Sequence, residues 1–463
     1  METEMGEDLS AMQGKLTAWI QTKMPEARNL SVSDLQKPGM GLSSETHLFN
    51  INWKEAGQSK SVGAVLRSAP RSRGAFPEYD LGLQFRLMKI LGENTDVPVA
   101  EMLWLEEDPS VLGVPFFLMK KLEGDVPQDY PSYHGTGMYF DATPEIRRKM
   151  WWGSLDAMVK LHKVDWRCLE LDFIGAPGAG TDPIDRQLAY WERHLIWTKD
   201  SPEETYPTME AALAWLKENR YEPERVTLCW GDARIGNTLY SRPDRDVLAV
   251  MDWEMAFIGD PEADLVWSYT LDKQMARGLG LPRLEGTPTD EEVVGHYEEL
   301  SGWKAKNLFY NEVLATFRYG QTLIAVQKRM RDQGIPIEDD VILNNFATQE
   351  LAALLGLPSP GPNRYAEEKV DINQLTVSVQ FHYTGPSGYD WHLVSDKGSV
   401  SRHPGCVENP DCTITASIED WRAIQSGKLN QLEAWTTGRL VTEGDYGLLT
   451  LLGDAIAKYS SEE

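Results

Sequence analysis

Three side chains at fixed spacing in the middle of the chain have the types that phosphoryl transfer requires. Asp232 precedes Asn237 by five positions, and Asp252 follows fifteen residues later, at the end of the apolar run DVLAVMD. A carboxylate on a loop can accept the proton of a hydroxyl nucleophile, while an amide and a second carboxylate can hold divalent ions against phosphate oxygens. This pattern predicts a site that uses ATP and Mg²⁺ to phosphorylate a hydroxyl group.

The segments around these residues resemble the aminoglycoside phosphotransferase family, which shares the protein-kinase-like fold. The family pattern H-G-D-x-x-x-x-N, a D-W-E strand end and G-D-P-x-x-D-L is matched by WGDARIGN, MDWE and GDPEADL, and the resemblance extends over roughly residues 30 to 350. It implies that Asp232 is the catalytic base, that Asn237 and Asp252 bind magnesium, and that Asp264 is a buried aspartate holding the loop. The alternative is that these are ordinary turn residues.

The nucleotide site is expected ahead of this loop. No G-x-x-x-x-G-K-[ST] occurs, which excludes a P-loop. The resemblance places the phosphate-covering loop in KPGMGLSSET and the interlobe hinge, with the adenine, in VPFFLMKKLEG. The nucleotide-binding residues that it implies are Gly41, Ser43, Ser44, Arg67, Met119, Lys120 and Leu122. The alternatives are an ordinary turn for the glycine loop, a solvated strand-edge arginine, and a core methionine.

Several residues depart from the family pattern. Arg67 stands where a protein kinase has lysine, although a guanidinium can also grip phosphate oxygens. The helix glutamate that usually pairs with this cation is replaced by Gln84, so either the pairing is neutral or Glu78 takes it over. Trp230 replaces the histidine before Gly-Asp, which we expect to change packing. His162 lies on an apolar helix face and is predicted to be a core histidine.

The elements that must position these residues form an α+β pattern. β-prone runs fill the first third on either side of the turn-like KEAGQ, and a helix is expected from Glu78 to Leu91. Thr143-Pro144-Glu145 predicts a helix start, and apolar positions at helical spacing dominate from about residue 144 to 330, with two short strands embedded among them. The proline-rich LPSPGP marks a linker. We therefore expect a bilobal protein-kinase-like fold followed by a small α+β domain. The predicted boundaries are 1–124 for the ATP-binding lobe, 125–356 for the catalytic lobe, 357–370 for the linker and 371–463 for the last domain.

After the linker the apolar period changes to two, as in LTVSVQFHY and CTITASI. Residues from about 371 to 459 resemble the sterol carrier protein family, on the segments VSVQFHYTG, YDWHLVSDKG and TGRLVTEGD. The resemblance implies a sheet and helices around an apolar tunnel for a lipid or acyl-CoA ligand. Trp421, Trp435 and Leu440 either line such a tunnel or fill the core.

Composition excludes several classes of partner. The chain of 463 residues has 45 basic and 71 acidic residues and a formal net charge of -26, which disfavours nucleic acid. It contains only 4 cysteines, with no C-x-x-C, and no apolar run approaches the ~20 residues that span a bilayer. The acidic start METEMGEDLS resembles no secretory signal. These features predict a cytoplasmic protein without a transmembrane segment.

Together these features predict an ATP-dependent phosphotransferase that acts on an alcohol group. The attached lipid-type domain favours a small hydrophobic acceptor, such as a hydroxyacyl thioester or a sterol-like or other lipid alcohol. Relatives fused to acyl-CoA dehydrogenase domains point the same way by analogy. The alternatives are a non-catalytic lipid carrier with a nucleotide-sensing scaffold, which Arg67 and Gln84 favour, an antibiotic-type aminoglycoside phosphotransferase, and a protein kinase, which the missing A-P-E motif disfavours.

Overall fold

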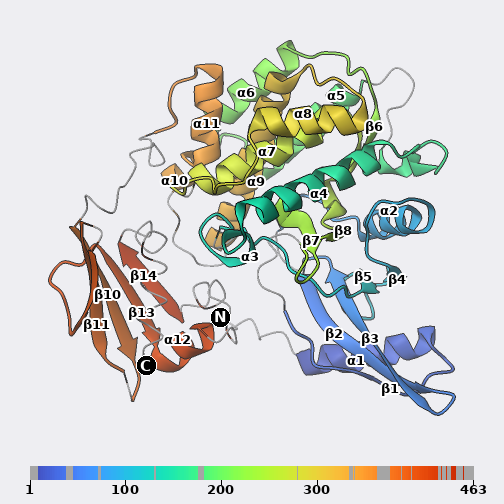
Figure 1. Cartoon of the computed structure of the whole chain (residues 1–463), viewed down its shortest axis with the longest axis horizontal. Helices are drawn as coiled ribbons and strands as arrows, with labels where there is room; N and C mark the ends of the chain where they lie inside the picture. Colours follow the sequence, from blue (N-terminus) through green and yellow to red (C-terminus); the bar gives the residue numbers. More distant parts are fainter. Residues whose placement is uncertain are drawn as a thin grey trace.

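A computed structural model of the chain shows a strand-rich N-terminal lobe, a helical lobe and a second sheet near the C-terminus (Figure 1). The structure describes residues 9–37, 45–70, 74–129, 132–175, 182–278, 280–332, 337, 339–361, 376–386, 388–397, 399–425, 429, 434, 439–444 and 452. The expected α+β class is confirmed. Among the described residues, no helix combines the length and apolar character needed to cross a bilayer.

The N-terminal lobe is one antiparallel sheet of order β1-β2-β3-β5-β4. Its elements are α1 (Leu9–Lys23), β1 (Arg28–Val32), β2 (Glu45–Glu55), β3 (Gln58–Ser68), α2 (Leu81–Asn94), β4 (Met102–Glu106) and β5 (Phe116–Lys120). The predicted turn between β2 and β3 is confirmed, because Glu55 pairs with Gln58 around Ala56 and Gly57. Both turn residues have positive φ, as a tight hairpin with right-handed strand twist requires.

The helical lobe contains the remaining helices before the linker. They are α3 (Gly137–Phe140), α4 (Pro144–His162), α5 (Pro183–Thr198), α6 (Pro207–Glu218), α7 (Glu262–Arg277), α8 (Asp290–Ser301), α9 (Leu308–Asp332), α10 (Asp339–Leu343) and α11 (Phe346–Leu355). The predicted start of α4 is confirmed: Thr143 caps the helix by accepting the N–H of Ile146, and Pro144 occupies the first turn. Two apolar cores hold this lobe together, one centred on α4 and α7 and the other on α5, α6 and α9.

Two short hairpin-like pairs lie within the helical lobe and carry the loops of interest. β6 (Thr227–Cys229) pairs with β9 (Phe257–Gly259), and β7 (Thr238–Tyr240) pairs with β8 (Val247–Val250). Single 3-10 turns, Ile235–Asn237 and Trp253–Met255, lead from one pair into the other. The loop from Trp230 to Asn237 therefore begins and ends on strands whose partners flank Asp252.

The C-terminal domain is a five-stranded sheet of order β12-β11-β10-β13-β14, with β10 and β13 parallel. Its elements are β10 (Thr376–Thr384), β11 (Asp390–Asp396), β12 (Ser399–Pro404), β13 (Cys412–Ser417), α12 (Ile418–Gln425) and β14 (Leu440–Gly444). The rings of Phe381 and Trp391 stack with centroids 4.0 Å apart, and Trp421 packs edge-on against Phe381. Trp421 and Leu440 thus belong to the packed core.

Some predictions differ from the structure or cannot be compared with it. The helix expected from Glu78 to Leu91 spans Leu81–Asn94, because the Asp80 side chain caps it by accepting the N–H of Leu83. The helix α1 was not predicted; it places Leu16 and Trp19 against the sheet. The residues Gly41, Ser43, Ser44 and Trp435 lie outside the described residues, as does most of the linker.

One buried histidine joins the two lobes. His194 on α5 is fully buried, with its Nε2 3.0 Å from the carbonyl of Ala75 and its Nδ1 2.9 Å from Oε1 of Gln321 on α9. Burial lowers the pKa of His194 to about 4, although the contacts with Ala75 and Gln321 act in the opposite direction. The folded protein therefore holds this ring neutral at a pH where an unfolded chain would begin to protonate it.

This histidine predicts a specific pH dependence of stability. Its folded pKa of about 4 lies below the ordinary value of 6.5, so the unfolded state binds more protons between these limits and stability falls as the pH is lowered through them. We expect a loss of about 1.4 kcal/mol per pH unit from this residue. Urea unfolding of wild type and His194→Gln at a series of pH values isolates the contribution. Parallel curves for the two proteins would contradict the assignment.

Candidate active site

The loop after β6 holds Asp232 with three side-chain donors. Its Oδ1 accepts the indole N–H of Trp267 at 2.7 Å and Nε of Arg234 at 3.0 Å, and its Oδ2 accepts Nδ2 of Asn237 at 2.6 Å. The carboxylate is 14% exposed. These donors fix the rotamer of the side chain, so Asp232 presents an oriented acceptor at the surface of the loop. The sequence-predicted pair Asp232 and Asn237 is therefore in direct contact.

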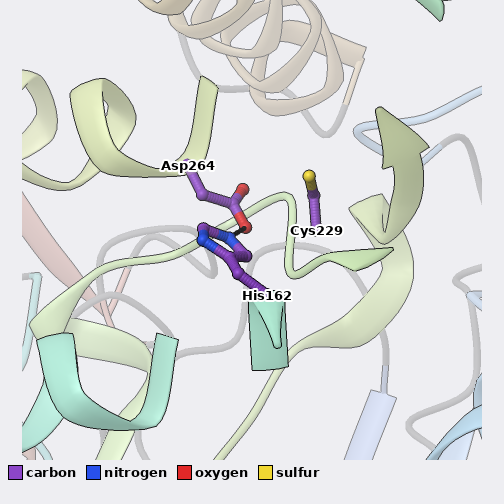
Figure 2. Close-up of side chains that lie close together, drawn as sticks. All are labelled: His162, Cys229 and Asp264. Atoms are coloured by element: carbon purple, nitrogen blue, oxygen red, sulfur yellow. Dashed lines mark hydrogen bonds and ion pairs between the residues drawn. The ribbon is translucent and has the colours of Figure 1, made fainter. Parts of the chain in front are cut away.

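The backbone of this loop is held by Asp264 at the start of α7. Its Oδ2 accepts the N–H of Trp230 at 2.5 Å and its Oδ1 accepts the N–H of Gly231 at 2.9 Å. His162 on α4 lies 3.1 Å from the same carboxylate through Nε2, and its Nδ1 lies 2.9 Å from the hydroxyl of Tyr297. Figure 2 shows the imidazole facing the Asp264 carboxylate. Asp264 has the position of a loop anchor, and His162 is a satisfied core histidine, as predicted.

His162, Asp264 and Cys229 also lie close enough together to suggest a metal site, with ligand atoms within 4.8 Å of one another (Figure 2). The hydrogen bonds argue against one, because both ring nitrogens and both carboxylate oxygens are already engaged. Burial also raises the pKa of the Cys229 thiol, whereas metal binding requires the thiolate. This cluster is therefore part of the core that supports the loop.

Gly231 is a position in the loop where the backbone leaves no room for a side chain. Its φ is +89°, and a Cβ built there would lie 2.0 Å from the carbonyl oxygen of Met255. On its other side, the Gly231 carbonyl accepts Nη2 of Arg318 on α9 at 2.6 Å. The glycine is thus enclosed between the 3-10 turn after Asp252 and the helical lobe, which sets the direction in which the next residue, Asp232, leaves the backbone.

Asp252 lies beside the same loop and pairs with Arg67. Its φ of 63° places it in the left-handed region, which a short polar residue tolerates better than most and which often marks a functional position. Oδ1 of Asp252 lies 3.1 Å from Nη2 of Arg67 at the end of β3. Burial works against the Arg67 cation, but the carboxylates of Asp252 and Glu254 raise its pKa overall. Asp252 is thus a partner of this cation, one that the expected choice between Gln84 and Glu78 did not include.

The residues present fit a magnesium site. The N–H of Met251 donates to the carbonyl of Asn237 at 2.8 Å, which sets Asp252 next to Asn237 across the β7–β8 pair. The Asn237 amide nitrogen is committed to Asp232, so its oxygen is the atom that remains for an ion. Carboxylate and amide oxygens are suitable ligands for Mg²⁺. Glu254, whose charge helps to raise the pKa of Arg67, supplies a further carboxylate near this position.

The expected hinge is the end of β5 and the residues after it. Met119 is half-buried and packs against the core centred on α4. The N–H of Lys120 donates to the carbonyl of Glu101 at 2.8 Å, and the N–H of Lys121 donates to the carbonyl of Gly63 at 2.9 Å. Within the described residues, Leu122 forms no such backbone bond. On this segment the N–H of Leu122, rather than that of Lys120, is the backbone donor that remains for an adenine ring.

Sequence reasoning missed four side chains around Asp232. Arg234 bonds both Asp232 and Asp129, and Trp267 links Asp232 to Arg318 through a cation–π contact of 4.3 Å. Two signals were present in the sequence: Arg234 lies in the motif itself, and Arg318 interrupts an apolar face of the long helix. Asp129 and Trp267 carry no local signal, because only the tertiary packing brings them to the loop.

Comparisons with known proteins agree with this geometry. Residues 54–297 match the sequence model of the phosphotransferase enzyme family, and residues 363–456 match that of the SCP-2 sterol transfer family. A Ralstonia eutropha protein described as an aminoglycoside phosphotransferase has a similar solved structure, with a TM-score of 0.52 and 23% identity over 74% of this chain and 95% of that one. This likeness confirms the expected bilobal kinase-like fold.

Two curated relatives carry acyl-CoA dehydrogenase names. Acyl-CoA dehydrogenase family member 10 of Mus musculus is 33% identical over 204 residues, which cover 44% of this chain and 18% of the relative. The Arabidopsis thaliana protein IBR3, named as an acyl-CoA dehydrogenase, is 27% identical over 310 residues, which cover 63% of this chain and 36% of the relative. The chain therefore spans only a minor part of either relative's length.

Gly231 gives the sharpest test of the loop geometry. We expect Gly231→Ala to lower the free energy of unfolding by about 3 kcal/mol or more, because backbone strain adds to the collision with Met255. Gly113→Ala is the matched control: its φ is +92° but no atom lies within 4 Å of its Cβ position, so only strain of about 1–2 kcal/mol applies. Denaturant unfolding measures both. Equal losses would show that Gly231 is not enclosed.

Proposed function

The chain belongs to the phosphotransferase enzyme family, and we propose that it transfers the γ-phosphate of ATP, with Mg²⁺, to the hydroxyl group of a small hydrophobic molecule. The observation that carries this proposal is the carboxylate of Asp232, which three donors orient and which contacts Asn237. A spectator turn residue would not need three converging donors. The division into lobes at 1–124 and 125–356, with a lipid-handling domain at 371–463, is part of the proposal.

In the proposed reaction Asp232 acts as the general base. The acceptor hydroxyl donates its proton to the carboxylate while its oxygen bonds to the γ-phosphorus, and the bond from that phosphorus to the ADP oxygen breaks. Asn237 and Asp252 would hold the magnesium, which when bound neutralises charge on the phosphate oxygens. The hydrogen bonds from Trp267 and Arg234 occupy Oδ1 of Asp232, so the carboxylate keeps its orientation when the acceptor binds.

The nucleotide site is proposed between the lobes. Arg67 is at the end of β3 beside Asp252, where a guanidinium can bind phosphate oxygens. Met119, Lys120 and Leu122 would flank the adenine, with Leu122 as the free backbone donor. Gly41, Ser43 and Ser44 remain candidates for covering the phosphates. Arg67 pairs with the Asp252 carboxylate, which supports a role in binding phosphate beside a divalent cation. This pairing argues against the alternative of a solvated arginine at a strand edge.

The proposed acceptor is a hydroxyacyl thioester, a sterol-like molecule or another lipid alcohol. The match of residues 363–456 to a sterol transfer family supports a lipid or acyl-CoA ligand in the C-terminal domain. The acyl-CoA dehydrogenase names of the relatives support an acyl substrate. We place the enzyme in the cytoplasm, where its 4 free cysteines are stable. Incubating the protein with a metabolite extract and labelled ATP, and then determining which molecules become labelled, would identify the acceptor.

A non-catalytic lipid carrier with a nucleotide-sensing scaffold is the competing function. Gln84, in place of the usual glutamate, favours it. The three donors on Asp232 count against it, because a sensor has no need of an oriented base. An antibiotic-modifying enzyme is disfavoured by the attached lipid-type domain.

The first prediction from this proposal concerns the base. Asp232→Asn should lower kcat by about 10²–10⁴-fold, with little change in ATP affinity, since a base contributes mainly to the transition state. Phosphorylation of the identified acceptor by labelled ATP measures the first effect, and calorimetry with Mg-ATP the second. Asp246→Asn, at an exposed carboxylate paired with Lys149 near the same hairpin, is the control and should keep full turnover. Normal turnover by Asp232→Asn would remove Asp232 from the mechanism.

The second prediction concerns the C-terminal domain. A protein that ends after Gly361 keeps α11 and the bond from Gln349 to the Gly361 carbonyl, and should still bind Mg-ATP. It should lose activity selectively on long-chain alcohols, mainly through a higher KM, because a tethered carrier raises the effective concentration of a poorly soluble acceptor. The measurement is kcat/KM against chain length for the full and shortened proteins. Parallel curves would show that the domain does not present the acceptor.

A further inference from the structure

A cavity opens beside the 3-10 turn that follows Asp252. It has a volume of about 310 Å³ and lies between α5, the segment from Glu254 to Ile258, and α9. Its walls combine aromatic, cationic and anionic side chains, among them Arg186, Tyr190, Arg193, Glu254, Phe257 and Arg318. Three arginines against one glutamate give the cavity a positive lining in a chain whose formal net charge is -26.

Arg318 is the feature of this cavity that demands an explanation. It is 1% exposed, and the one hydrogen bond that it forms with the described residues runs from Nη2 to the Gly231 carbonyl, while its Nε is buried without a partner among them. No carboxylate among the described residues forms an ion pair with it. Trp191 and Trp267 face the guanidinium at 5.4 and 4.3 Å. Burial lowers the pKa of the Arg318 guanidinium, although the carboxylates of Asp264 and Asp232 act in the opposite direction without bonding to it. Burying a cation with no directly bonded carboxylate is costly, so the unpartnered Nε of Arg318 indicates an anion that binds to it.

The rest of the lining extends this positive region. Arg193 is exposed and lies over the ring of Tyr190 at 5.9 Å, about two helical turns from Arg186 on α5. Burial and the Glu254 carboxylate raise the pKa of Tyr190 to about 12, while Arg318 and Arg193 act in the opposite direction. Tyr190 therefore lies between the two signs of charge.

The cavity adjoins the proposed site of transfer. Arg318 bonds the carbonyl of Gly231, the residue before Asp232, and it stacks on Trp267, whose indole N–H bonds Asp232. Glu254, two residues after Asp252, lines the cavity and also acts on the pKa of Arg67. A ligand bound here would thus have its charged end next to the loop that carries the base.

We propose that this cavity binds an anionic group of the phosphate acceptor, a carboxylate or a phosphate, with the apolar body of that molecule against Phe257 and Tyr190. This inference rests on the proposed function in one respect, since it assigns the ligand to the acceptor. It narrows the acceptor class from any hydrophobic alcohol to one that also bears a negative group. The bond geometry of arginine suits both anions, because its planar donors can bind two oxygens at once.

The test uses simple probes and the full-length protein. Hexanoate, hexyl phosphate and the uncharged hexanamide have the same chain, so they differ mainly in the group that would meet the arginines. Calorimetry should give a dissociation constant at least tenfold lower for one of the anions than for hexanamide, because a hydrogen-bonded charge contributes more than a neutral group. Tighter binding of hexanoate would identify a carboxylate site, and tighter binding of hexyl phosphate a phosphate site.

Variants then locate the binding. Arg318→Gln should abolish the preference for the anion, and Arg193→Gln should weaken it by about twofold to fivefold, as expected for an exposed partner. Lys217→Gln removes one exposed cation from α6, outside the cavity, and should bind the anion like wild type. Arg318→Lys keeps the charge and should retain part of the preference. The melting temperature of each variant reports folding, and Arg193→Gln keeps the test valid if Arg318→Gln unfolds.

Two results would overturn the inference. One is binding of hexanamide as tight as that of both anions. The other is an anion preference that Arg193→Gln and a folded Arg318 variant leave unchanged. Neither result affects the proposed phosphotransfer, which is judged separately by the loss of labelled product in Asp232→Asn. Conversely, an anion preference that depends on the arginines would stand even if no transfer were detected.

Discussion

The carboxylate of Asp264 is completely buried and receives the N–H groups of two consecutive residues, Trp230 and Gly231. Everything on the catalytic loop depends on this contact, because it fixes the peptide planes just before Asp232. A buried carboxylate without such donors would be strongly unfavourable, so the loop and the anchor stabilise each other. His162 and Tyr297 complete the arrangement from α4 and α8, which connects the loop to the largest apolar core.

The neighbours of Asp232 follow from that fixed backbone. Gly231 is enclosed by Met255 on one side and Arg318 on the other, so the Asp232 side chain leaves the loop toward Trp267, Arg234 and Asn237. These donors come from two separate parts of the sequence, the loop itself and α7. Their convergence on one carboxylate is what distinguishes a prepared base from an aspartate in a polar turn, and it requires the helical lobe to be packed as well as the loop.

The sequence predicted the parts of this site that are local. The spacing of Asp232, Asn237 and Asp252 is a property of one loop and one strand pair, and Thr143 with Pro144 identifies a helix start from adjacent residues alone. Apolar alternation likewise predicted β10 and its core positions.

Contacts between distant segments could not be predicted in this way. The partner of Arg67 lies 185 positions away, and Asp129 lies 105 positions from Arg234. Periodicity shows which face of α9 is apolar, but it does not show that Arg318 on that helix meets the Gly231 carbonyl. Such contacts depend on how whole helices pack, and many different lone arginines would give the same local pattern. The helix α1 was missed for a related reason, since its amphipathic signal is weak and its packing partners lie on the sheet.

The ion pair between Arg67 and Asp252 has a consequence for how the ligands enter. One partner is on β3 of the N-terminal lobe and the other follows β8 in the helical lobe, so the pair bridges the two halves of the molecule. Asp252, a proposed metal ligand, is therefore already paired with the Arg67 guanidinium, and an incoming divalent ion must compete with that cation for the carboxylate. Phosphate oxygens offer Arg67 a replacement partner at the same moment. The guanidinium thus favours arrival of metal and nucleotide together over arrival of the metal alone.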